Sequence, residues 1–302
     1  MIKINIHVLT PNRLLELMIK YGGNPRCLSS ATSEPSSKIS KILMEVHHNH
    51  TLSIFPAVYS EGLGLSKYAV LVKNFPIKYE TAARLLHPIM NLFRGDIEEN
   101  MFSIILFGNK EVVEDLHQVI DRLKQNGTSV LISEIRRTRE FVRDPQCYDF
   151  TTGKWTCYTK IELRQGSSLS RPDNEDVHEI LTLQLNPFFD IRLLRHKNHV
   201  FKIITGFMYV LGEKNFIVQA FTKDDISDRF PDIVWTAETN DGFISEMHLN
   251  KEGLEFVMRK LRNEAIDVII SPKSPLYALG YSIPYEIFTY GKWSFPKIKI
   301  VS

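Results

Sequence analysis

The sequence lacks the features that would place it in a membrane or in a disulfide-stabilised fold. No stretch reaches the roughly 18 apolar residues that a membrane-spanning helix needs. The three cysteines, Cys27, Cys147 and Cys157, are scattered, which excludes a disulfide framework or zinc knuckle and predicts reduced thiols. The first ten residues alternate apolar and polar side chains, which predicts a strand over 2–8 rather than a signal peptide. We therefore expect a cytoplasmic protein.

The chain also lacks an excess of charge and any linear catalytic motif. Its 37 Lys and Arg balance 35 Asp and Glu, for a net charge of +2, so it has no overall electrostatic signature of a nucleic-acid binder. It has no glycine-rich phosphate loop, no His-Glu-x-x-His and no Cys-x-x-Cys. With 43% hydrophobic and 24% charged residues over 302 positions, it has an ordinary globular composition and ample length for a core.

The hydrophobic pattern mixes strands and helices without regular alternation, which favours an α+β fold. The clearest unit is an apolar strand over 102–107, an amphipathic helix over 110–124 and a strand over 129–135. We predict two lobes, 1–145 and 146–302, of mixed or antiparallel sheet with a few packed helices. Further predicted strands are 42–47, 51–58, 68–72, 155–163, 180–185, 200–211, 216–221, 233–237, 243–249, 267–271 and 298–301, with helices over 12–21, 79–93 and 251–263 and polar loops over 28–40 and 166–176.

Two segments repeat each other. Asn109-Lys-Glu, which follows the strand 102–107, matches Asn250-Lys-Glu, which follows the strand 243–249, and the helix and strand after each match align without a gap. Asn at such a position predicts a helix N-cap, with the following Glu near the positive end of the helix dipole. The spacing indicates two divergent copies of one α+β unit. The alternative is a chance recurrence of a common capping pattern.

The second copy resembles a known protein family. The strand that ends in His248-Leu-Asn-Lys-Glu-Gly-Leu, followed by a leucine-rich helix and a strand over 235–271, is similar to immunity proteins of bacterial polymorphic toxin systems. Residues 102–133 are a fainter match. The resemblance implies a non-enzymatic α+β protein that neutralises a cognate toxin by direct binding, with no cofactor.

Several acidic residues are candidates for contacting such a partner. The loop 224–232 carries Asp224, Asp225, Asp228 and Asp232, and lacks the central Gly and terminal Glu of a calcium loop. We expect it to contact a basic partner. The alternative is a solvated connection before the next strand.

Glu246 and His248 share one face of a predicted strand. A carboxylate that orients an imidazole is the start of an acid–base site, and we include both residues among the binding candidates. The alternative is a cross-strand surface pair.

Histidine-rich segments offer weak metal candidates. On a strand, Glu45 and His47 would share one face and His48 and His50 the other, and two imidazoles on one face with a third ligand would form a zinc site. A polar strand end explains the same residues. A second pair, His196 and His199, lies between predicted strands and is most simply a solvated loop.

One dense basic segment, Arg136-Arg-Thr-Arg139 with Arg143, suits phosphate contacts, but a charged face explains it more simply, and we do not expect nucleic acid or membrane partners. Two other functions stay open: an enzyme whose site, for instance a histidine-bound metal, is assembled from distant residues, and a viral or phage accessory protein.

Overall fold

The computed structural model describes residues 9–74, 79–98, 101–123, 127–281 and 283–298. It confirms the α+β class, because helices pack against a large antiparallel sheet. The strand predicted over 2–8 and nearly all of the one predicted over 298–301 lie outside the described residues. Within the described ranges, no helix is both long and apolar enough to cross a membrane.

The chain begins with three helices, α1 (Pro11–Tyr21), α2 (Pro25–Thr32) and α3 (Ser36–His50). α1 matches its prediction: the Thr10 side chain accepts from the Arg13 amide, and Gly22 ends the helix at a φ of +72°, which suits glycine. α2 and α3 overturn the loop predicted over 28–40 and the strand predicted over 42–47. The buried side chains of α3 recur every three or four residues, a helical period that a six-residue window conceals.

After β1 (Ser53–Val58) and η1 (Ser60–Leu63), the chain forms the first half of the sheet. Its elements are β2 (Ser66–Lys73), α4 (Tyr79–Leu86), β3 (Met90–Gly95), β4 (Met101–Gly108), α5 (Lys110–Leu123) and β5 (Ser129–Arg143). The strands pair in the order β5-β2-β4-β3, all antiparallel. This β-α-β-β-α-β order is that of ferredoxin-like units. α4 and β3 replace the single helix predicted over 79–93, because Pro88 cannot continue a helix.

The second half repeats the order of strands, with the short 3-10 helix η4 (Ser227–Arg229) in the place of α4. Its elements are α6 (Asn174–Leu185), η3 (Ile191–Leu193), α7 (Lys197–Ile203), β9 (Ile204–Val210), β10 (Phe216–Thr222), η4, β11 (Ile233–Thr239), β12 (Gly242–Leu249), α8 (Lys251–Leu261) and β13 (Ala265–Pro272). The strand order β13-β10-β12-β11 matches that of the first half. The matched asparagines act as predicted: Asn109 Oδ1 accepts from the Val112 amide at 3.0 Å and Asn250 Oδ1 from the Gly253 amide at 2.8 Å. The element order is therefore that of an internal repeat.

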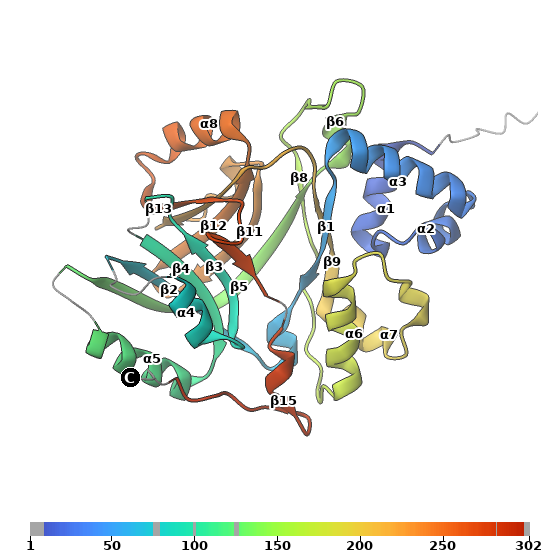
Figure 1. Cartoon of the computed structure of the whole chain (residues 1–302). Coiled ribbons are helices and arrows are strands. Elements are labelled where there is room, and N and C mark those ends of the chain that lie inside the picture. Colours follow the sequence, from blue (N-terminus) through green and yellow to red (C-terminus); the bar gives the residue numbers. More distant parts are fainter. Residues whose placement is uncertain (1–8, 75–78, 99–100, 124–126, 282, 299–302) are drawn as a thin grey trace, which may run out of the picture.

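The two halves form one sheet. β11 pairs with β5, from Trp235 opposite Glu140 to Thr239 opposite Ile135. At the far ends, β13 and the segment after β3 also meet: the Ile97 amide donates to the Ile270 carbonyl at 2.8 Å, and the Ser271 hydroxyl donates to the Gly95 carbonyl at 2.6 Å. The sheet therefore curls so that its two halves face each other across a shared interior (Figure 1).

Helices cover the outer faces of the two halves. α4 and α5 pack on the first half and α8 on the second, each over its own apolar cluster. A third cluster lies between the half-sheets and draws on both. Its buried members are Ala69, Leu71, Ile105, Ile135, Phe221, Ala237, Ile244 and Ile269.

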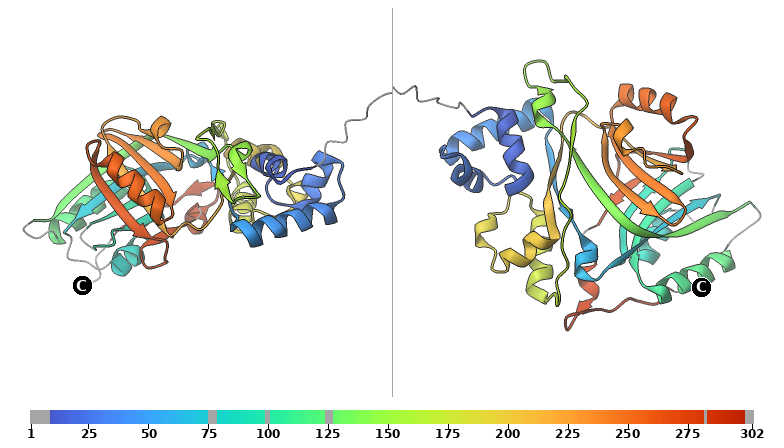
Figure 2. Two further views of the ribbon diagram at one scale, coloured as in Figure 1. Left: turned by 90° about the horizontal axis from the view of Figure 1, so that it is seen from above. Right: turned by 180° about the vertical axis from the view of Figure 1, so that it is seen from behind.

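The remaining helices form a second part of the molecule. β1 pairs with β9 in a separate two-stranded ladder, and α1–α3 and α6–α7 lie on its side away from the large sheet (Figure 1; Figure 2 shows the same division from above and behind). Each half of the sequence thus contributes to both parts. The boundary predicted near residue 145 falls just after β5, at η2 (Pro145–Cys147).

Other segments differ from their predictions. α6 replaces the strand predicted over 180–185, because Asp173 and Asp176 form a capping box that starts a helix. α7 takes the start of 200–211, and only the short strands β7 (Lys154–Trp155) and β8 (Lys160–Glu162) form within or beside 155–163. The remaining short strands are β6 (Tyr148–Asp149), β14 (Ala278–Gly280), β15 (Phe288–Thr289) and β16 (Lys292–Trp293), with η5 (Tyr285–Ile287).

The cysteines also differ from expectation. Cys147 and Cys157 form a disulfide, whereas the sequence analysis predicted reduced thiols. The β6–β7 hairpin brings their Cα atoms to 5.1 Å, within the range a disulfide spans. A hairpin of this kind cannot be recognised from cysteine spacing alone. Cys27 is free and buried, and its thiol donates to Asp190 at 3.1 Å.

Reduction of this disulfide is expected to lower the free energy of unfolding by about 3 kcal/mol, because it frees a loop of ten residues in the unfolded chain. Thermal melts with and without dithiothreitol measure the effect, and Cys147→Ser with Cys157→Ser should reproduce it. The Cys27→Ser variant is the control and should respond to dithiothreitol as the wild type does. An unchanged melt on reduction would contradict the prediction.

Candidate functional site

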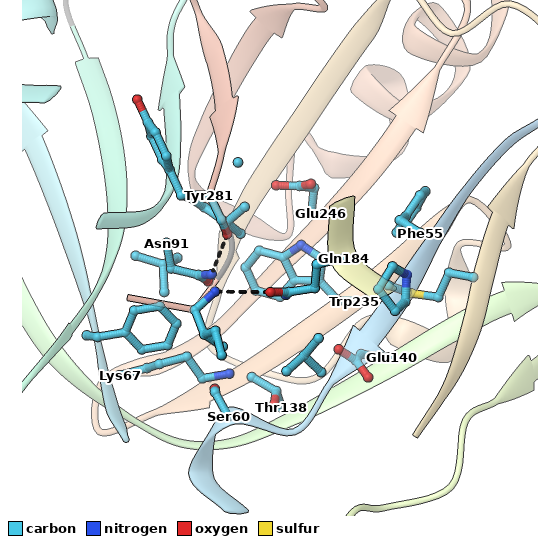
Figure 3. A pocket seen from close by; sticks show the side chains of 18 of the residues that line it. Phe55, Ser60, Lys67, Asn91, Thr138, Glu140, Gln184, Trp235, Glu246 and Tyr281 are labelled. Carbon is cyan, nitrogen blue, oxygen red and sulfur yellow. Dashed lines mark hydrogen bonds between the residues drawn. The ribbon is translucent and has the colours of Figure 1, made fainter. Parts of the chain in front are cut away.

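A cavity of about 600 Å³ lies where the two halves of the sheet, the β1–β9 ladder and α6 meet (Figure 3). Such a volume falls within the usual range of small-molecule sites, which favour domain junctions. Its walls are largely apolar and aromatic. The apolar lining residues include Phe55, Ile105, Phe107, Ile135, Leu181, Met208, Trp235, Tyr281 and Tyr285.

One wall carries a buried ionic network centred on Glu246. Arg94 Nε and Nη2 each donate to this carboxylate at 2.9 Å, and Gln219 Nε2 donates at 2.8 Å. Glu246 and Arg94 are 2% and 6% exposed. Burial alone would raise the pKa of Glu246, but the Arg94 guanidinium and the His248 hydrogen bond outweigh it, and its pKa lies well below the usual range. Glu246 is therefore ionised.

The ionised carboxylate determines which nitrogen of His248 carries the proton. Its Nε2 lies 3.1 Å from Glu246 Oε1, and an ionised carboxylate only accepts hydrogen bonds. Nε2 therefore carries the proton, and in the neutral imidazole Nδ1 is the acceptor. His248 also lines the cavity, with its ring stacked 6.4 Å from that of Phe55. The hydrogen bond to the carboxylate therefore fixes both the tautomer and the orientation of the ring.

A second polar group gathers around Glu61. Its carboxylate lies 3.0 Å from the Lys67 ammonium and accepts hydrogen bonds from the hydroxyls of Ser60 at 3.4 Å and Thr138 at 3.5 Å. Lys67 is 7% exposed and faces the cavity with Ser60 and Thr138 (Figure 3). Only one of the three hydrogens of its ammonium group is needed for Glu61.

Glu140 lies beside this group and has an altered acidity. It lines the cavity and accepts a hydrogen bond from the Thr205 hydroxyl at 3.1 Å. Burial raises the pKa of Glu140, although the nearby Lys67 charge opposes the shift. The cavity thus holds a carboxyl whose pKa is raised by burial and an imidazole whose Nδ1 is an acceptor, the two kinds of group that acid–base chemistry requires.

A second cavity, of about 710 Å³, lies between α1, α2 and α7. Its walls include Lys20, Ala31, Arg164 and Lys197. Arg164 Nη2 donates to backbone carbonyls, among them that of Ile204 at 3.0 Å. The first cavity differs because it lies between the two halves of the sheet and holds the buried ion pair of Arg94 and Glu246.

The structure places two of the predicted binding residues in the first cavity. Glu246 and His248 do share a strand face, but they lie in the interior between the half-sheets rather than on the surface. The sequence analysis did not find Arg94, Lys67 or Glu140. Arg94 is 152 residues from Glu246, and no local pattern reports such a contact.

The acidic loop and the basic segment contact each other. Asp225 pairs with Arg139 at 2.6 Å, and Asp232 pairs with Arg143 at 3.1 Å. Asp224 and Asp228 are exposed. The loop therefore uses part of its charge within the chain, and the rest remains available to a partner.

The structure separates one pair of candidate histidines and brings the other pair together. His48 and His50 lie on α3 rather than on a strand, so residues two apart no longer share a face; His50 Nδ1 lies 3.1 Å from the Tyr148 hydroxyl. His196 and His199, by contrast, converge on Asp176.

Comparison with known proteins finds no matching family model and no matching curated protein. Among solved structures, the siroheme decarboxylase NirDL resembles this chain with a TM-score of 0.46 and 12% identity, over 91% of this chain and 94% of that one. The same enzyme in complex with an iron-uroporphyrin III analogue gives a TM-score of 0.43 and 12% identity, over 87% and 91%. Because both scores are below 0.5, the function proposed below rests on the residues of this chain alone.

Two matched substitutions should change stability in opposite directions. Glu246→Gln is expected to lower the free energy of unfolding by about 3–5 kcal/mol at pH 7, because it leaves the buried Arg94 charge unpaired. Its effect should persist down to about pH 5, because the lowered pKa of Glu246 keeps the wild-type carboxylate ionised in the folded protein, and should begin to shrink only at lower pH, where the unfolded chain takes up the proton.

Glu140→Gln should stabilise the protein above the raised pKa of Glu140, where the wild type must hold an ionised, partly buried carboxylate, and should have little effect at pH 4. Chemical denaturation of both variants from pH 4 to pH 8 measures the two trends. Destabilisation by Glu140→Gln at pH 8 would contradict the assignment.

Proposed function

We propose that this protein binds a small organic molecule with a flat apolar body and an acidic group in the cavity between its two halves. The observation that carries this proposal is a cavity of about 600 Å³ that combines aromatic walls with buried charged side chains. Groups with perturbed pKa values in a cleft are typical of functional sites.

The apolar walls support the first part of the proposal. Phe55, Trp235 and Tyr281 surround the space in Figure 3, and aromatic rings favour stacked or edge contacts with another ring. A ligand of this kind would replace water that otherwise faces apolar surface, which is favourable in proportion to the area covered.

The polar groups support the second part. Lys67 has hydrogens beyond the one that faces Glu61, and the raised pKa of Glu140 makes this carboxyl less repulsive to an anionic group than an ordinary glutamate. An acidic group at this end would gain charge-assisted hydrogen bonds. Binding should therefore weaken as the pH rises through the pKa of Glu140.

Two other functions remain predictions. Neutralisation of a toxin by direct binding would use a surface rather than this cavity, with Asp224 and Asp228 as exposed acidic contacts. An enzymatic role would use His248 as base and Glu140 as acid on a molecule bound in the same cavity.

The fluorescent probe 1-anilinonaphthalene-8-sulfonate, a flat aromatic anion, tests the proposal directly. We expect one saturable site in the cavity and about tenfold weaker binding by Lys67→Met, the loss that removal of one charge-assisted hydrogen bond produces. Leu181→Trp, which fills the cavity from α6, should abolish binding at this site. Fluorescence titration gives the affinity of each variant, and circular dichroism checks that each folds.

Matched controls lie in the second cavity. Lys20→Met removes a lysine charge there, as Lys67→Met does in the first cavity, and Ala31→Trp introduces the same bulky ring as Leu181→Trp. Both variants should leave binding unchanged. If Lys20→Met and Ala31→Trp weaken binding while Lys67→Met and Leu181→Trp do not, the probe occupies the other cavity and the proposal is wrong.

A further inference from the structure

Three metal-ligating side chains converge on one point outside both cavities. Asp176 Oδ1 lies 2.9 Å from His196 Nδ1 and 3.0 Å from His199 Nδ1. One ligand atom from each residue lies within 4.8 Å of the other two, and within the described residues this is the one group of three or more such side chains. The Asp176 side chain is fully buried, whereas the imidazoles of His196 and His199 are 34% and 46% exposed.

The N-terminus of α6 holds the carboxylate in place. Asp176 is the third residue of the helix, and its Oδ2 accepts the Asp173 amide at 3.0 Å in the capping box. This hydrogen bond fixes the rotation of the carboxyl group, so Oδ1 is left to face the two imidazoles. A buried carboxylate with one oxygen occupied by the backbone is a rigid ligand.

The start of α7 holds the imidazoles. Glu179, one turn further along α6, is 5% exposed and accepts the backbone amides of Arg195 and His196, the latter at 3.0 Å. His196 is the N-cap of α7 and His199 lies in its first turn. Residues three apart on a helix are neighbours, which places the two ring centroids 5.6 Å apart.

We propose that Asp176, His196 and His199 bind a divalent transition-metal ion, with zinc as the preferred ion. Two imidazoles and one carboxylate, with solvent at the open side, form a three-ligand set that Zn²⁺ completes with water. Tetrahedral bonds of about 2.0–2.2 Å place neighbouring ligand atoms of one ion about 3.3–3.6 Å apart. The two Asp176 contacts, at 2.9 and 3.0 Å, therefore need to lengthen by only about half an ångström to admit the ion. Imidazole ligands disfavour Mg²⁺ and Ca²⁺, which take oxygen ligands.

The site would join α6 to α7 and is independent of any ligand in the cavity between the half-sheets. Without a metal, the same three side chains are joined by the hydrogen bonds between the two imidazoles and Asp176. The Asp176 hydrogen bond raises the pKa of His196, and protons therefore compete with the metal. The two arrangements differ in a measurable way, because only one binds zinc in a defined ratio.

The test uses the full chain purified without a polyhistidine tag and treated with EDTA. Titration with Zn²⁺ against a chromophoric chelator should give one site per chain with a dissociation constant below 1 μM, and Zn²⁺ but not Mg²⁺ should raise the melting temperature. Affinity should fall at least tenfold between pH 7.5 and pH 5.5, as the imidazoles are protonated.

His199→Gln and His196→Gln should each weaken Zn²⁺ binding at least tenfold and remove the thermal shift. Both histidines are partly exposed, so we expect these variants to fold, which circular dichroism checks. His48→Gln, at an exposed position on α3, is the matched control and should bind as the wild type does. A second control, Glu45→Gln, tests the other histidine-rich segment.

Three results would overturn the proposal. These are the absence of a stoichiometric Zn²⁺ site, a site lost in His48→Gln or Glu45→Gln instead, and retention of binding by both His196→Gln and His199→Gln. None of these results bears on binding of the fluorescent probe, so failure of the metal site and failure of the proposed cavity function are distinguishable.

Discussion

The buried ion pair between Arg94 and Glu246 constrains how the two halves of this protein face each other. Arg94 lies on β3 of the first half and Glu246 on β12 of the second. Removing such charges from water costs several kcal/mol per ion, which only close pairing with further hydrogen bonds offsets. Sliding one half over the other would separate the charges, so the pair selects one relative placement and, with it, one shape for the cavity.

The same constraint gives the cavity two different ends. At one, Arg94 and Gln219 hold Glu246 ionised, and this in turn fixes the tautomer of His248. At the other, Lys67 is paired with Glu61 beside Glu140, whose pKa is raised by burial. The aromatic walls lie between the two ends. The charge of Glu246 and the tautomer of His248 therefore depend on a contact between strands from opposite halves of the sequence.

The sequence predicted best where local patterns decide the structure. The strand–helix–strand unit over 102–135, its repeat and the two asparagine caps were found because apolar periodicity and capping are local signals. The segments that form α3 and α6 were predicted in part as strands, because short windows hide a helical period. For α6, the Asp173–Asp176 capping box is a local signal that indicates the helix. Glu246 and His248 were paired correctly from strand alternation, but not placed inside. Arg94, Lys67 and Glu140 depend on the order of strands in the sheet, which no local pattern encodes.

The two copies carry different residues at matched positions, whereas two identical chains would carry the same residues. It aligns Glu246 and His248 on β12 with Ile105 and Phe107 on β4, and all four line the same cavity. In a two-fold dimer of one unit, both walls would carry the same residues, so either two carboxylates would face each other or none would be present. Joining the copies in one chain lets the matched positions differ, so that they are apolar on β4 and polar on β12.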